Sequence, residues 1–161
     1  MEQPSTIEYP TSAGGVVYRF SPVMEFLLCG RTSQNPGSVG SNGMQWHLPK
    51  GTPESGELIE ETALREVKEE TGYAVQVKKY LQEIRYSFQN SKKNITYEKT
   101  VHFYLMSVIS GDTSLHDSEF EEVKWVNSDD ALNLIGYENE KQIISSAIGY
   151  LKEFVNERGT S

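Results

Sequence analysis

Hydrophobic and polar positions near the start of the chain predict two neighbouring strands. SAGGVVYRF, from Ser12 to Phe20, is rich in small and β-branched residues, and EFLLCGR, from Glu25 to Arg31, follows after a short turn that contains Pro22. Apolar runs bounded by turn residues are typical of β-strands. The next residues, Thr32 to Met44, are dense in Gly, Ser, Asn and Pro. Their composition predicts a mobile surface loop rather than a linker between domains.

Further along, the pattern predicts a hairpin and a last short strand. YAVQVKKYLQEIRYSF, which begins at Tyr73, alternates loosely between apolar and polar residues, and ITYEKTVHFYLMSVIS, from Ile95 to Ser110, is strongly β-prone. The polar QNSKKN between them fits a hairpin loop. EEVKWV, from Glu121 to Val126, predicts the last strand.

Between these two groups of strands, a charged segment predicts a helix that begins at Glu57 and ends at Gly72. At about 100° per residue, Ala63, Leu64 and Val67 fall on one side of this helix and can pack on a sheet. Another side gathers three glutamates, which are Glu66, Glu69 and Glu70.

The C-terminal part of the chain has a helical pattern. Ser128 is the expected cap of DDALNLI, and the next segment spaces four apolar side chains along one helix face, which are Ile143, Ala147, Leu151 and Phe154. The predicted order is therefore strands, helix, strands, helix. This order predicts the α+β class, with a mixed sheet flanked by helices.

The three glutamates of the middle helix carry like charges at neighbouring positions of its surface. No lysine or arginine stands three or four residues after any of them to relieve their repulsion. A hard divalent cation such as Mg²⁺ would relieve it, because it prefers carboxylate oxygens and bridges them to substrate phosphates. The spacing therefore favours metal-assisted hydrolysis of a phosphoanhydride. The alternative is a solvated helix face supported by pairs such as Glu61 with Arg65.

Composition narrows the class of protein. A chain of 161 residues, 37% of them hydrophobic, predicts one globular domain over residues 1–161, with its core at about 10–156. There is no long apolar run and no basic, hydrophobic N-terminal stretch, so we expect a cytoplasmic protein without a membrane partner. The net charge of −8 argues against a stable nucleic-acid partner. The lone cysteine, Cys29, lies in an apolar run and predicts a buried core residue.

The charged segment resembles a known family. Its glycines, glutamates and arginine have the spacing of the complete signature of the Nudix hydrolases: Gly51, Glu57, Arg65, Glu66, Val67, Glu69, Glu70 and Gly72. One position departs, because Tyr73 stands where the family usually has an aliphatic residue. The resemblance is sharp over these 23 residues, and over most of the rest only the order of strands and helices is similar.

The resemblance implies a fold, a cofactor and a reaction. The fold is the Nudix α/β/α sandwich, with the mixed sheet between helices, and the reaction is hydrolysis of a nucleoside diphosphate linked to another group. By the same resemblance, Glu66, Glu69 and Glu70 would bind Mg²⁺ or Mn²⁺, with the carbonyl of Gly51 as a further ligand. Glu57 would pair with Arg65 and hold the loop to the helix.

Members of the family often use one more glutamate, from a later loop, as base or extra ligand. In HDSEFEEVKWV the candidates are Glu119 and Glu122, and Glu119 is similar in position to the glutamate of dinucleoside polyphosphate (ApnA) hydrolases. An exposed, purely structural loop is the alternative for both.

Residues outside the Nudix signature segment favour ApnA or a related small nucleotide as the substrate. WHLPKG, from Trp46 to Gly51, resembles the lead-in of those members, in which Lys50 would meet a phosphate as a point charge. Tyr86 would stack on a base, with a core role as its alternative. His47 adjoins the site and is a candidate phosphate contact. In ADP-ribose hydrolases a proline often follows the signature segment, and this chain does not have that proline.

The sequence alone leaves other substrates open, and also another class of protein. The same chemistry would serve a nucleoside triphosphate, the 5′ end of an RNA or a diphosphoinositol phosphate. A domain that binds nucleotides as a sensor, without turnover, is the alternative of another class. The intact glutamate triple argues against it, since a domain that only binds has no need of three such costly charges.

Overall fold

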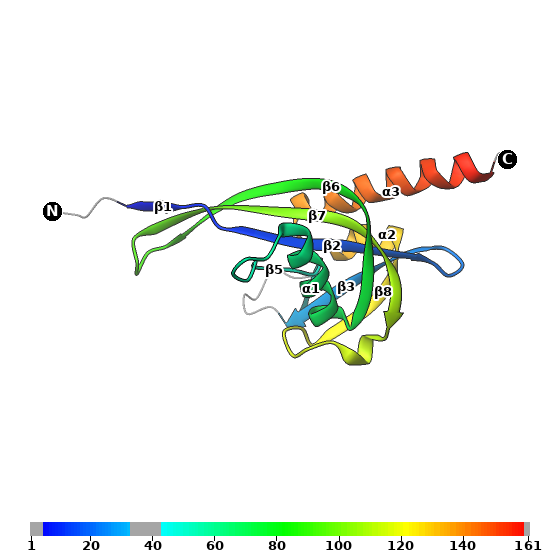
Figure 1. Ribbon diagram of the computed structural model, residues 1–161, viewed down its shortest axis with the longest axis horizontal. Coiled ribbons are helices and arrows are strands. Elements are labelled where there is room, and N and C mark those ends of the chain that lie inside the picture. The colour runs from blue at the N-terminus through cyan, green and yellow to red at the C-terminus, as the bar shows by residue number, and fades with distance from the viewer. Residues whose placement is uncertain (1–4, 33–42, 160–161) are drawn as a thin grey trace.

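The computed structural model of the protein describes residues 5–32 and 43–159, and gives side-chain surroundings up to residue 155. Most of the predicted loop from Thr32 to Met44 lies outside the described residues. Within them, eight strands form one mixed sheet, in which β1, β7, β2, β3 and β4 follow one another, while β5 pairs with β2, β6 with β7 and β8 with β3 (Figure 1).

The second and third strands follow the sequence prediction closely, whereas the first was not predicted. β1 (Thr6–Glu8) is short, and β2 (Thr11–Phe20) and β3 (Met24–Thr32) pair antiparallel around the predicted turn. On its other side β2 runs parallel to β7, and its residues from 12 to 17 are all buried. A strand buried on both faces needs small and apolar side chains throughout, which explains the glycines and valines of this stretch.

Two very short strands follow, and then the long hairpin. β4 (Met44–His47) pairs with β3, and β5 (Lys50–Gly51) pairs with β2. β6 (Tyr73–Asn90) and β7 (Ile95–Gly111) form the predicted antiparallel hairpin, and β8 (Glu122–Asn127) pairs with β3. The irregular alternation along β6 has a physical cause, because its register with β7 shifts at three places.

Three α-helices lie in the described part of the chain: α1 (Ile59–Thr71), α2 (Ser128–Leu134) and α3 (Glu138–Gly159). Gly72 ends α1 in the left-handed conformation (φ 85°), as predicted. The predicted start at Glu57 is wrong, because the N-cap is Leu58, whose N–H donates to Glu61. The predicted cap Ser128 is also wrong, because Asn127 accepts the N–H of Asp130 and caps α2. None of the helices in these ranges combines the length and apolarity of a membrane span.

The helices cover opposite faces of the sheet and enclose two apolar clusters, which confirms the α+β sandwich (Figure 1). Ala63 and Val67 of α1 are fully buried against one face, together with Cys29 of β3. The other face packs against α2 and α3, with Phe26, Leu28, Phe103, Ile143, Ala147 and Leu151 among the buried side chains. Phe154 is not part of this buried face as predicted, since it is 36% exposed where the last turns of α3 extend away from the body of the molecule (Figure 1).

Candidate functional site

The loop before α1 approaches the helix most closely at Gly51. A Cβ atom on Gly51 would lie 2.0 Å from Cδ of Glu66 and 2.3 Å from its Oε2. Carbon atoms in ordinary contact stay about 3.5–4.0 Å apart, so only glycine allows this approach. Pairing of Gly51 with Ala13 of β2 fixes the backbone on the other side. The glycine of β5 therefore brings the main chain directly against one glutamate of the helix.

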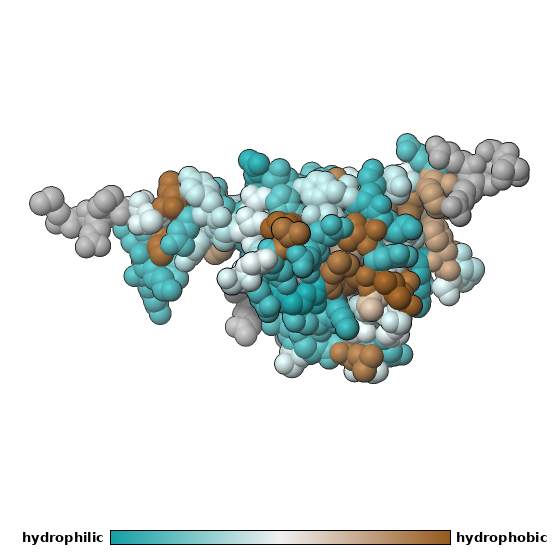
Figure 2. Space-filling model, viewed as in Figure 1, coloured by the Kyte–Doolittle hydropathy of each residue, from teal (hydrophilic) through white to brown (hydrophobic). Residues whose placement is uncertain are grey.

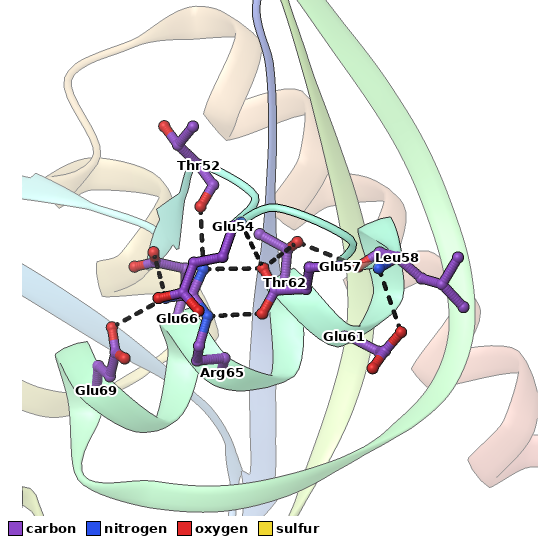
Figure 3. Close-up of polar contacts among 9 residues, drawn as sticks. All are labelled: Thr52, Glu54, Glu57, Leu58, Glu61, Thr62, Arg65, Glu66 and Glu69. Atoms are coloured by element: carbon purple, nitrogen blue, oxygen red, sulfur yellow. Dashed lines mark hydrogen bonds and ion pairs between the residues drawn. The ribbon is translucent and has the colours of Figure 1, made fainter.

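Arg65 is the hub of the polar contacts on α1 (Figure 3). Its Nε and Nη2 donate to the two carboxylate oxygens of Glu57 at 2.7 and 2.9 Å, and Nη2 also donates to the carbonyl of Thr52 at 3.0 Å. The predicted pair of Glu57 and Arg65 is present and bidentate. Its hydrogen bonds lower the pKa of the Glu57 carboxyl to about 2 and raise the pKa of Arg65 further above its usual range.

The same guanidinium also reaches two of the three clustered glutamates. Nη1 of Arg65 donates to Glu66 at 2.9 Å and to Glu69 at 3.2 Å (Figure 3). The sequence argument that no cation relieves the cluster is therefore wrong for these two, because Arg65 precedes Glu69 by four residues and Glu66 by one. Pairing of Glu61 with Arg65, the alternative from the sequence, is absent among the described contacts, and Glu61 binds the N–H of Leu58.

Glu70 is the third glutamate, and its surroundings differ. It is 6% exposed, and Oε2 accepts the backbone N–H of Lys50 at 3.1 Å. Burial raises the pKa of its carboxyl to about 8, with the N–H of Lys50 opposing and the charges of Glu66 and Asp117 adding to the rise. Burial likewise raises the pKa of Glu66. Carboxylates held this way are destabilised as anions, and a bound cation would stabilise them.

The residues fit a hard divalent cation in donor chemistry. All donors are carboxylate or carbonyl oxygens, which suit Mg²⁺ or Mn²⁺. Glu66 touches Gly51 and Glu70 binds the adjacent N–H of Lys50, so both meet the same turn of the main chain. Glu69 is 48% exposed and points to Arg65. Across residues 5–32 and 43–159, no three His, Cys, Asp or Glu side chains are gathered as a ready metal cluster.

A pocket of about 470 Å³ opens beside Glu70. This volume is in the range of sites for small molecules. Glu70 lines it, together with every residue predicted to bind substrate, which are His47, Lys50 and Tyr86. Apolar contact comes from Leu48, Ile84, Phe120 and Tyr137. The outer surface over α1, by contrast, is mainly hydrophilic (Figure 2).

The structure separates the two candidate loop glutamates. Glu119 lines the pocket, is 57% exposed and lies 3.5 Å from Nη1 of Arg31. Glu122 starts β8 opposite Gly30 and is not among the residues lining this pocket. Of the two, Glu119 is therefore the one placed beside Glu70 and Lys50.

Sequence reasoning missed three polar residues at this place. Arg31 ends the predicted second strand and lies over the ring of Phe120 at 5.5 Å. Asp117 donates its backbone N–H to the carbonyl of Glu69 at 2.8 Å, and its charge contributes to the raised pKa of Glu70. Glu140 reaches the pocket from α3. The sequence could have pointed to Arg31, because a cationic side chain follows directly after an apolar strand. Asp117 and Glu140 are brought to the site only by the fold.

Comparison with known proteins gives one consistent family. The NUDIX domain family model matches residues 8–146. The putative mutator protein MutT4 of Mycobacterium tuberculosis (strain CDC 1551 / Oshkosh) is 35% identical over 143 residues, which are 86% of this chain and 54% of that protein. The ADP-ribose pyrophosphatase of Bacillus subtilis is 40% identical over 91 residues, 55% of this chain and 46% of that one. The chain spans about half or less of the length of these and the other curated relatives it matches.

Solved structures agree on the fold. A binary complex of the Ap4A hydrolase of Caenorhabditis elegans has a TM-score of 0.66 at 22% identity, over 89% of this chain and 98% of that one. The NUDIX domain of Shewanella oneidensis NrtR, complexed with ADP ribose, also has a TM-score of 0.66, at 18% identity over 89% of each chain. At such identities the likeness shows the fold alone.

Proposed function

The chain belongs to the Nudix hydrolase family, and on this premise we propose that it hydrolyses a phosphoanhydride bond in a nucleoside diphosphate linked to another group. One observation supports this most strongly. Glu70 of α1 and Lys50 of β5 line one pocket of about 470 Å³, and Glu66 lies against Gly51, the residue after Lys50. A carboxylate for a cation and a lysine for phosphate thus face one space large enough for a nucleotide.

In this proposal Glu66, Glu69, Glu70 and the carbonyl of Gly51 hold Mg²⁺ or Mn²⁺. When bound, the ion neutralises phosphate charge and activates a water for attack. Arg65 positions Glu66 and Glu69, to which its Nη1 donates, because Arg65 is itself anchored to Glu57 and to the carbonyl of Thr52. Arg65 thus holds these carboxylates in place, and the absence of a side chain at Gly51 leaves room for Glu66.

Other residues of the pocket act on the substrate. Lys50 and Arg31, which both line the pocket, bind phosphate oxygens. Tyr86 stacks on a base. Glu119, on the exposed loop, takes the proton of the attacking water or serves as an extra ligand, and its ion pair with Arg31 at 3.5 Å holds it at the rim.

A dinucleoside polyphosphate, or a related small nucleotide, is the proposed substrate class. The lead-in WHLPKG supports it, because His47, Leu48 and Lys50 of this stretch line the same pocket as Glu70. The named activities of relatives cover other nucleotides, including the ADP-ribose pyrophosphatase and an 8-oxo-(d)GTP phosphatase of Mycolicibacterium smegmatis, 27% identical over 99 residues. A nucleoside triphosphate, an RNA 5′ end and a diphosphoinositol phosphate therefore belong in the test.

We also propose that residues 1–161 act as one domain in the cytoplasm, on a small molecule and without a nucleic-acid partner. The alternative is a sensor that binds nucleotide without turnover. Glu70 argues against the sensor, because a buried carboxyl with a pKa raised to about 8 costs stability, which binding alone does not require.

The experiment is a substrate panel. Purified protein is incubated with Mg²⁺ and ApnA, nucleoside triphosphates, ADP-ribose, diphosphoinositol phosphate and triphosphorylated or capped RNA, and products are separated by chromatography. The proposal predicts turnover, with an ApnA or another small nucleotide as the best substrate. Binding of nucleotide without any product would support the sensor instead.

A further inference from the structure

A buried glutamate of the C-terminal helix lies against the histidine of the pocket. Glu140, in the first turn of α3, is 3% exposed, and its Oε1 accepts the backbone N–H of Leu48 at 2.9 Å. Its other oxygen, Oε2, lies 3.6 Å from Nδ1 of His47. A buried carboxylate needs partners, and the described contacts give Glu140 these two. Glu140 therefore contacts both the side chain of His47 and the backbone of Leu48, and it holds these two neighbouring residues in place.

The second ring nitrogen of His47 has no partner. His47 is 7% exposed, and its Nε2 is buried without a hydrogen bond to the described part of the protein. A buried polar atom left unpaired destabilises a fold, so it calls for a partner. Because His47 lines the pocket, a group of a bound ligand is the natural partner.

Two aromatic rings of the pocket lining pack near the imidazole. The ring centroids of Phe120 and Tyr137 lie 6.2 and 5.5 Å from that of His47. Phe120 is buried, whereas Tyr137, just before α3, is 48% exposed. Tyr137 is therefore the more exposed of the two rings that pack near His47.

We propose that Glu140 is a positioning residue that keeps the proton of neutral His47 on Nδ1, so that Nε2 accepts a hydrogen bond from the nucleoside part of the substrate. A carboxylate only accepts hydrogen bonds, and its charge next to Nδ1 favours N–H at that atom. Nε2 then carries the lone pair. This inference rests on the proposed function, because it takes the pocket as the substrate site.

The chemistry of the acceptor selects the ligand group. A phosphate oxygen carries no proton to donate, so the candidate phosphate contact of His47 is replaced by a contact to a donor. Donors in the nucleoside part are an exocyclic amino group of the base and the hydroxyls of the ribose. Both would pair with Nε2 in the same way, and substrate analogues distinguish them.

The first test reads the proton directly. ¹⁵N-histidine NMR of the full chain at about pH 8, where a free imidazole is neutral, separates protonated from unprotonated ring nitrogens. Wild type should show His47 protonated at Nδ1 alone. In Glu140→Gln the amide can still accept from Leu48 while its NH₂ donates to Nδ1, so the proton should move to Nε2. The same tautomer in both proteins would overturn the positioning role.

The second test measures binding of ATP, purine riboside triphosphate, 2′-deoxy-ATP and 3′-deoxy-ATP. One analogue that lacks a donor should bind wild type about 10-fold more weakly than ATP, the size of one lost hydrogen bond with its acceptor left unpaired. That difference should vanish in Glu140→Gln and in His47→Phe, which keeps a ring against Phe120 and Tyr137. Glu138→Gln is the matched control, since Glu138 is an exposed glutamate of the same helical turn.

The outcomes separate a positioning role from a structural one. A structural role would weaken all four ligands equally in Glu140→Gln and leave their order unchanged, which contradicts the inference. Equal binding of the four ligands by wild type contradicts it as well. If no nucleotide binds at all, the proposed function fails, while the NMR result still decides whether Glu140 sets the tautomer of His47.

Discussion

The approach of Gly51 to Glu66 makes Gly51→Ala a sharp test of the metal site. The new Cβ would lie 2.0 Å from Cδ of Glu66, whereas ordinary contact needs about 3.5–4.0 Å, so the carboxylate has to move by about 1.5–2 Å. Ligand distances at a metal site tolerate only about 0.2 Å. We therefore expect Gly51→Ala to lower turnover by at least about 100-fold and to weaken Mn²⁺ binding.

The fold should survive this change. The heavy atoms nearest to the new Cβ all belong to the carboxylate of Glu66. This group is the end of a flexible side chain and can move. Gly51 is not among the glycines with positive φ, so alanine can adopt its backbone conformation. The free energy of unfolding should change by less than about 1 kcal/mol, the usual range of such substitutions.

The assay pairs turnover and Mn²⁺ titration by electron paramagnetic resonance with urea unfolding. Gly149→Ala is the control, because a Cβ at this exposed position of α3 meets nothing within 4 Å, and activity should stay unchanged. Full activity and metal affinity in Gly51→Ala would refute the reasoning. Global unfolding of the variant would refute the claim that only Glu66 has to yield.

Three further predictions follow from the contacts of the site and the core. Arg65→Lys cannot keep the fork to Glu57, so affinity for Mn²⁺ should fall by about 10- to 100-fold in the same titration, and unchanged affinity would remove Arg65 from the site. Glu119→Gln should lower turnover at least about 10-fold more than Glu122→Gln, and the reverse order would move the loop role to Glu122. Phe103→Ala, at a fully buried side chain, should cost about 3–5 kcal/mol in urea unfolding, and a loss below about 1 kcal/mol would contradict its place in the core.

The sequence predicted what local spacing controls. β2, β3, β8, the hairpin of β6 and β7 and the end of α1 at Gly72 follow from apolar patterns and turn residues within short windows, whereas β1, β4 and β5 were not predicted. The cluster of Glu66, Glu69 and Glu70 follows from their spacing, and the pair of Glu57 with Arg65 was implied by the resemblance to the Nudix family. These features depend on neighbours within a few residues, or on one helix, so the pattern is sufficient to predict them.

What the sequence missed depends only partly on packing. Glu140 reaches the N–H of Leu48 across 92 residues, and only the docking of α3 brings the two together. The contacts of Arg65 with Glu66 and Glu69 are local, and they escaped prediction because only cations after each glutamate were considered, whereas this guanidinium precedes them. The cap of α2 is also local, since Asn127 rather than Ser128 accepts the N–H of Asp130.

The central claim is that the glutamates of α1 serve metal-dependent hydrolysis. The most direct measurement is turnover of the best substrate of the panel by wild type, Glu69→Gln and Glu70→Gln, with Mg²⁺ and after its removal with EDTA. Both substitutions keep shape and remove a charge, so each should lower turnover by at least about 100-fold while the fold survives, and EDTA should abolish activity until Mg²⁺ is restored. Near-normal turnover in both variants, or activity that persists in EDTA, would contradict the account.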